Sequence, residues 1–192
     1  MPGICGIASR DPIADIDSDL ERLGDALRHF SWYASERYVA AGRQFAMARV
    51  HLNVLPAVAP DDDRSRDEHP TWLHGEESDG YTRVQYDPAK KTVTITNDRF
   101  GMMPLFYTCV GGTLIFGTEL KAVVAHPAVE RRLDDRGLAD LVAFGFILGQ
   151  KTLVHGVECL PGGARLQFAL ATGELRIDRV WDFRDQVGRG TA

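Results

Sequence analysis

The chain has 192 residues, of which 44% are hydrophobic and 26% charged, a length and composition that suit one globular domain. A formal net charge of −5 with scattered basic residues argues against a nucleic-acid partner. No apolar run approaches the roughly 20 residues that span a bilayer, so we expect no membrane partner. The 3 cysteines are widely spaced, which predicts a reduced, cytoplasmic protein with no disulfide framework and no metal site.

The first half of the chain predicts a strand, a helix and a second strand. Residues 3–9 read as a short buried strand, and leucines at helical spacing predict an amphipathic helix over residues 18–29. Ser18-Asp-Leu-Glu21 is a capping-box pattern for that helix. A strand is expected over residues 45–54. Residues 56–80 are rich in proline and aspartate, which indicates a mobile loop with a short strand at Trp72-Leu73.

The second half predicts hairpins first and helices afterwards. Alternating segments predict hairpins over residues 81–96 and 105–116. Helices are expected over about residues 119–126 and 135–148, the second with Asp134 as its N-cap. Strands at residues 164–170 and 175–181 precede a tail, residues 186–192, that we expect to be disordered. Because strands and helices come in blocks, the sequence predicts the α+β class with antiparallel sheets.

Several segments carry a more specific pattern, including a run of Asp-Arg-Phe-Gly-x-x-Pro-Leu that starts at Asp98. The others are Gly3–Ala8, Phe116–Pro127, Thr152–Gly162 and Arg179–Asp182. Together they resemble the amino-terminal domain of glutamine-hydrolysing asparagine synthetases, a class II glutamine amidotransferase domain. The resemblance covers about two-thirds of the chain and is densest from residue 80 to residue 182.

This resemblance implies a fold, a domain organisation and a set of partners. The implied fold is the four-layer αββα sandwich of N-terminal-nucleophile hydrolases, here shortened in the middle, over residues 1–183 with a tail at 184–192. The family's ATP-dependent synthetase half carries a serine- and glycine-rich pyrophosphate loop, which we do not find in this sequence. We therefore expect no cofactor on this chain, and ATP and magnesium only on a partner synthetase domain. A homodimer is left open.

In the family, a cysteine at the start of the mature chain attacks the side-chain amide of glutamine, and the free α-amino group serves as the base. The matching residue is Cys5, whose amine becomes free only if residues 1–4 are removed. The alternative is a buried, inert cysteine in a strand.

The resemblance also implies residues that bind glutamine. Alignment of the strand over residues 46–54 puts His51 where the family has a carboxylate-binding arginine, and Arg49 lies on the same strand face. His74 replaces an asparagine that helps to stabilise the oxyanion, and Gly75 and Glu76 match a glutamine-binding pair. Asp79 is the candidate for the ammonium of glutamine. Solvated strand side chains are the alternative for Arg49 and His51.

Three functions remain in view. The first is a glutaminase domain that supplies ammonia for asparagine biosynthesis by an ATP-dependent ligase. The second is a non-catalytic docking domain, as in lasso-peptide cyclases and β-lactam synthetases, and the altered positions 51 and 74 favour it. The third is an unrelated α+β binding domain, which the specificity of residues 97–127 disfavours.

Overall fold

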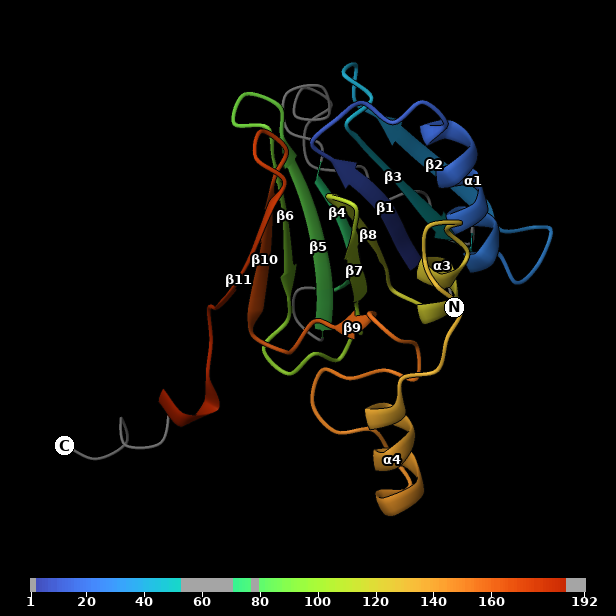
Figure 1. The fold of residues 1–192 in the computed structure, drawn as a ribbon. Helices are drawn as coiled ribbons and strands as arrows, with labels where there is room; N and C mark the ends of the chain where they lie inside the picture. The colour runs from blue at the N-terminus through green and yellow to red at the C-terminus, as the bar shows by residue number, and fades with distance from the viewer. Residues whose placement is uncertain (1–2, 53–70, 77–79, 186–192) are drawn as a thin grey trace.

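The computed structural model describes residues 3–52, 71–76 and 80–185, which form two stacked antiparallel sheets (Figure 1). One sheet has 6 strands in the order β2-β3-β1-β8-β7-β9. Its strands are β1 (Gly3–Ser9), β2 (Ala34–Val39), β3 (Phe45–His51), β7 (Phe106–Val110), β8 (Thr113–Gly117) and β9 (Glu158–Cys159). β1 therefore lies in the interior of this sheet and pairs with β3 on one side and β8 on the other.

The other sheet has 5 strands in the order β11-β10-β6-β5-β4. Its strands are β4 (Thr71–Glu76), β5 (Gly80–Asp87), β6 (Thr92–Asn97), β10 (Ala164–Ala169) and β11 (Glu174–Arg179). Alternation along both sheets sends apolar side chains such as Phe45, Val84 and Phe168 into the space between them. This main core is fully shielded from solvent at its centre, and it holds the two layers together.

A second apolar cluster lies on the outer face of the six-stranded sheet, under helices α1 (Ile16–Leu27) and α3 (Leu120–Val124). Leu20, Leu23 and Leu27 of α1 are buried against this face, as their helical spacing predicts. In the described residues, helices cover only this sheet. The prediction of an α+β sandwich of two antiparallel sheets is thus confirmed, whereas a second covering helix layer is not found in the part of the chain that the structure describes.

Helix α4 (Asp135–Phe144) projects from the lower end of the sandwich (Figure 1). Asp134 caps it as predicted, since its carboxylate accepts a hydrogen bond from the Gly137 amide over 2.9 Å. The helix ends at Gly145, whose φ of 78° is left-handed, so it is four residues shorter than predicted. The last described element is the short 3-10 helix η1 (Phe183–Asp185). None of the helices in the described ranges has the length and apolarity to cross a membrane.

One local prediction was wrong, and two strands, β2 and the two-residue β9, were not predicted. Helix α1 begins before Ser18, with Asp15 as N-cap and no side-chain capping bond, so the predicted capping box does not form. β2 was missed, because its sequence Ala-Ser-Glu-Arg-Tyr-Val has little alternation and no turn signal before it. Residues 53–70 and the tail from residue 186 lie outside the described residues, as do the predictions made for them.

Candidate functional site

The first strand sends neighbouring side chains to opposite faces of the six-stranded sheet. Ile4 points inward and belongs to the core between the sheets, whereas Cys5 points outward into the cluster beneath α1 and α3. Cys5 pairs with Ala48 of β3 and Gly117 of β8. Its thiol therefore lies in the middle of a sheet and against a helix layer, not at an open strand end.

Burial determines the chemistry of this thiol. Cys5 has no exposed surface, and removal from water raises its pKa to about 12 although the neighbouring Ala48 backbone lowers it. The thiolate is the nucleophilic form of cysteine, and burial suppresses it at neutral pH. The role of Cys5 as attacking group, which requires removal of residues 1–4, stays a prediction.

The two predicted carboxylate-binding residues lie on β3 and share its inner face. Arg49 and His51 alternate with Ala48 and Val50, which pack under the helices. Glu36 stands opposite Arg49 on the edge strand β2. Nη2 of Arg49 lies 2.9 Å from Oε2 of Glu36, and Nε2 of His51 lies 3.7 Å from Oε1 of the same carboxylate. Glu36 therefore already pairs with the positive charge of Arg49, which a substrate carboxylate would need as its partner.

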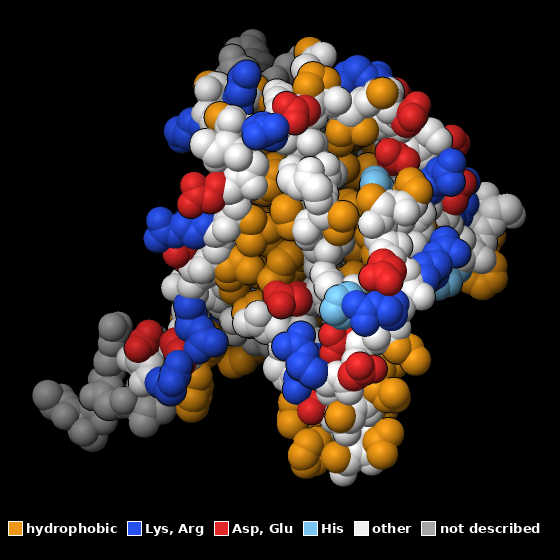
Figure 2. Space-filling model, in the orientation of Figure 1, with side chains coloured by type: hydrophobic (Ala, Val, Ile, Leu, Met, Phe, Trp, Pro, Cys, Tyr) orange, Lys and Arg blue, Asp and Glu red, His pale blue; other side chains and the backbone are white. Residues whose placement is uncertain are grey.

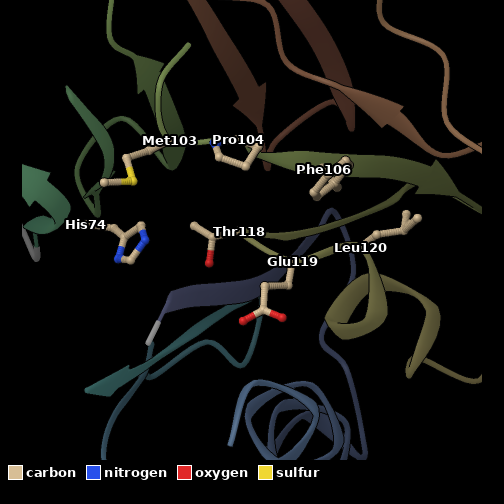
Figure 3. A pocket seen from close by; sticks show the side chains of 7 residues that line it. All are labelled: His74, Met103, Pro104, Phe106, Thr118, Glu119 and Leu120. Atoms are coloured by element: carbon tan, nitrogen blue, oxygen red, sulfur yellow. The ribbon is translucent and has the colours of Figure 1, made fainter. Parts of the chain in front are cut away.

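His74 lines a pocket at the end of the sandwich, where β4 of one sheet faces the segment after β8 of the other (Figure 3). We call this the His74 pocket. Its volume is about 370 Å³, and its lining residues are His74, Met103, Pro104, Phe106, Thr118, Glu119 and Leu120. In Figure 3, His74 lies on one side, Phe106 and Leu120 on the opposite side, and Thr118 and Glu119 between them. Cys5 is not among the lining residues.

Electrostatics keep His74 neutral. Burial is the largest effect and lowers its pKa, and the positive charge of Arg49 acts in the same direction. The negative charge of Glu119 opposes both but does not reverse the shift. A neutral imidazole offers one donor and one acceptor, so His74 can form a hydrogen bond to a ligand but supplies no charge.

Glu119 belongs to a charged cluster at the edge of the pocket. Its Oε1 lies 3.1 Å from Nε2 of His29, and its Oε2 lies 3.3 Å from Nζ of Lys121. These two partners hold the pKa of Glu119 below its usual value even though partial burial raises it. Within the described residues, no group of three His, Cys, Asp or Glu side chains is arranged to hold a metal ion.

Gly75, the next predicted binding residue, is not among the residues that line the pocket. Gly75 has a φ of 91°, and a Cβ at this position would come within 2.1 Å of the Gly80 carbonyl oxygen, so close strand approach explains this glycine. Glu76 ends β4 opposite Gly80. Asp79 lies outside the described residues.

The most specific sequence motif has a structural role. The Asp98 carboxylate accepts hydrogen bonds from the amides of Phe100 at 2.8 Å, Tyr81 at 3.3 Å and Met103 at 3.3 Å. It thereby fixes the turn that brings Met103 to the His74 pocket.

Two stacked antiparallel sheets with an interior first strand define the class of this protein. The solved structure of glutamine phosphoribosylpyrophosphate amidotransferase from Bacillus subtilis, complexed with ADP and GMP, covers 93% of the chain with a TM-score of 0.51. At 11% sequence identity, this likeness shows the fold alone, and the chain matches 49% of that structure. The fold is that of the class II, N-terminal-nucleophile-type amidotransferases.

The chain belongs to the glutamine amidotransferase domain family, whose model matches residues 77–181, more than half of the chain. It is 37% identical to asparagine synthetase (glutamine-hydrolyzing) 3 of Bacillus subtilis over 60 residues, and 29% identical to asparagine synthetase (glutamine-hydrolyzing) 2 over 109 residues. These matches cover 31% and 52% of this chain but only 10% and 14% of the two enzymes. The chain therefore corresponds to a small part of each relative.

Sequence reasoning missed two carboxylates that shape this region. Glu36 could not be found because β2 was not predicted, so nothing indicated that it faces Arg49. Glu119 was present in the recognised Phe-Gly-Thr-Glu motif, but only the fold brings it to His29 and to the pocket.

Proposed function

We propose that this domain is a glutamine amidotransferase homologue that does not hydrolyse glutamine and serves as a docking domain for an ATP-dependent synthetase-type domain. The observation that carries this proposal is the position of Cys5, buried on the helix side of β1 with its pKa raised to about 12. Burial at this position disfavours the thiolate, which is the attacking form of cysteine. A thiol buried in this way cannot sustain attack on an amide.

The surroundings of Ile4 argue against release of an amino-terminal Cys5. Ile4 is fully buried between the sheets, and its amide donates to Oγ1 of Thr118 over 3.1 Å. Loss of a buried isoleucine side chain alone costs roughly 2–5 kcal/mol of stability. Removal of residues 1–4 would therefore free the amine only by damaging the core.

Helix α4 supports a docking role because its apolar side chains face solvent. Val142 is 80% exposed and Phe144 is 58% exposed, and Gly137 is the one fully buried position of the helix. The exposed set forms what we call the α4 face, which consists of Leu138, Leu141, Val142, Phe144, Phe146 and Leu148. Figure 2 shows hydrophobic side chains gathered at this lower end of the molecule. Exposed apolar side chains gathered at one end of a molecule are typical of an interaction site.

The geometry of α4 indicates the shape of its partner. Val142 and Phe144 are two residues apart, so their directions differ by about 200° around the helix axis. A flat partner surface would cover one of them and leave the other in water. A groove that encloses the helix covers both, as in other helix-in-groove complexes. We therefore infer that α4 inserts into a groove on the partner domain.

Charges near the α4 face fit an apolar partner. Asp140 forms an ion pair with Lys151, and this contact holds the pKa of Asp140 below its usual value. The two opposite charges of this pair largely cancel, so the pair presents little net charge to the partner. The relatives that match this chain are asparagine synthetases in which the matched segments make up 14% or less of the length. By analogy, the partner is a synthetase-type domain, and it would carry ATP and magnesium.

Glutamate release and the mass of the intact protein test the catalytic half of this proposal. Purified full chain is incubated with L-glutamine beside the Cys5→Ala variant, and glutamate is quantified. We expect equal, background release from both proteins and a mass that retains Gly3 and Ile4. Glutamate release that depends on Cys5 would overturn the proposal.

A glutaminase is the second candidate. The positive charge of Arg49 acts on His74, and Arg49 and His51 both lie beside the Glu36 carboxylate, which favours a site for a charged substrate near His74. In that case His74 stabilises the oxyanion, and Gly75, Glu76 and Asp79 complete the predicted binding set. This function requires removal of residues 1–4, so a mass spectrum that begins at Cys5 would favour it.

A further inference from the structure

The His74 pocket has the size of a small-molecule site and is mostly apolar. Its volume of about 370 Å³ lies in the range of roughly 300–1,000 Å³ that ligand sites occupy. Four of its seven lining residues are apolar, and Met103 and Phe106 suit an aromatic ring because thioether sulfur and ring edges attract one another. The remaining three are His74, Thr118 and Glu119 (Figure 3).

Two of the polar lining groups are already engaged within the protein. Oγ1 of Thr118 accepts a hydrogen bond from the Ile4 amide over 3.1 Å and donates to the Ile4 carbonyl oxygen over 3.4 Å. The Glu119 carboxylate is paired with His29 and Lys121. The pocket therefore presents no uncompensated charge from these residues to a ligand.

Arg49, whose positive charge acts on His74, is also compensated. Arg49 does not line the pocket, and its guanidinium is paired with Glu36. A free amino acid that entered the pocket would leave water with two charges, and the described lining residues offer it neither an unpaired cation nor an unpaired anion. Such desolvation without compensation costs several kcal/mol, whereas burial of apolar surface is favourable.

His74 is the polar group left for recognition. Among the described residues, its ring makes no hydrogen bond, and it is neutral for the reasons given above. One donor and one acceptor on an otherwise apolar wall can bind a single hydroxyl or carbonyl group.

We propose that the His74 pocket binds an uncharged aromatic small molecule that carries one hydrogen-bonding group, and that it excludes glutamine and other zwitterions. This inference goes beyond the docking function, because it concerns a ligand of this chain alone. The two proposals are tested separately, because ligand binding is measured without a partner and without turnover.

The test compares three probes on the wild-type full chain by titration in NMR spectra. p-Cresol has the proposed chemistry, toluene lacks the hydroxyl, and L-glutamine is the zwitterion. We expect p-cresol to bind roughly 2- to 10-fold more tightly than toluene, the usual effect of one hydrogen bond, and glutamine not to bind. Tighter binding of glutamine than of p-cresol, or binding of no probe, would overturn the proposal.

Variants locate the binding site. Met103→Glu places a charge in the pocket and should weaken p-cresol binding at least tenfold, and the matched control Met102→Glu changes a neighbouring methionine that is exposed and outside the pocket. His74→Phe should remove the preference for p-cresol over toluene. Circular dichroism confirms that each variant is folded. An unchanged p-cresol affinity in folded Met103→Glu, or an unchanged preference in folded His74→Phe, would sink the idea.

Discussion

Arg49 and Glu36 stand opposite each other on β3 and β2, with Nη2 of the arginine 2.9 Å from Oε2 of the glutamate. The pair is mostly shielded from water, since 20% of the Arg49 side chain and 33% of the Glu36 side chain are exposed. Within the part of the chain that the structure describes, Nε of Arg49 is buried and has no hydrogen-bond partner. The guanidinium thus depends on Glu36 for its compensation, and any ligand carboxylate would have to compete with it.

Substitution Glu36→Gln should destabilise the fold. It removes the negative charge beside a half-buried guanidinium that already has an unsatisfied Nε, and such losses cost roughly 1–3 kcal/mol. The measurement is the free energy of unfolding in urea. The control is Glu21→Gln, which breaks a more exposed pair with Arg37 and should change stability by about 0.5 kcal/mol or less. Equal effects of the two substitutions would contradict the role assigned to Glu36.

Thiol reactivity should separate the three cysteines of the chain. Cys109 is exposed, Cys159 is partly buried, and Cys5 is fully buried with a pKa raised to about 12. Because thiolate fraction and access both control alkylation, we expect iodoacetamide at pH 8 to modify Cys109 first and Cys5 only after unfolding in urea. Peptide mass mapping after timed quenching gives the order. Modification of Cys5 in the native protein as fast as Cys109 would show that its thiol is accessible, contrary to the structure.

Most of the strand positions follow from periodicity, while the missed edge strand β2 shows the limit of that signal. The hairpin of β5 and β6 was predictable because Val84, Tyr86, Val93 and Ile95 alternate on both sides of a turn. β2 is an edge strand, and its half-buried residues give no period of two. Its position depends on pairing with β3, a contact between segments that a local pattern does not encode.

The candidate site was less predictable than the fold. His74 was identified from a short motif, and the structure does bring it to a pocket. The sequence does not show to which face of the sheet the Cys5 side chain points, because a shift of one residue in strand register moves every side chain to the opposite face. Ile4 faces the core between the sheets instead, and the pairing of β1 with β3 fixes that choice.

The pH dependence of stability should carry a contribution from His126. This side chain is buried, its Nδ1 accepts a hydrogen bond from the Ala128 amide over 3.1 Å, and its Nε2 lies 3.6 Å from Asp19. Burial lowers its pKa most, the charge of Arg22 adds to this, and Asp19 opposes it. The native state therefore prefers the neutral ring more than the unfolded state does, whose pKa is about 6.5.

It follows that the stability due to His126 is complete above about pH 6.5 and is lost as the pH falls toward the native pKa. The free energy of unfolding, measured between pH 5 and pH 8, should fall less steeply with acid in His126→Gln, whose amide does not titrate. His155→Gln changes an exposed histidine and serves as the control. A slope that is unchanged in His126→Gln would refute this assignment.

Substitutions on α4 should separate folding from docking. Val142→Glu and Phe144→Glu change exposed side chains, so each should alter the free energy of unfolding by about 0.5 kcal/mol or less. If α4 inserts into a groove on a synthetase-type partner, each variant buries a charge in that groove, and affinity should fall at least tenfold. Because the two positions point in directions about 200° apart, a groove predicts loss in both variants, whereas a flat contact predicts loss in one. Co-elution of the mixed proteins in size-exclusion chromatography measures this, with Val110→Glu on the β7–β8 hairpin as a matched apolar-to-acidic control.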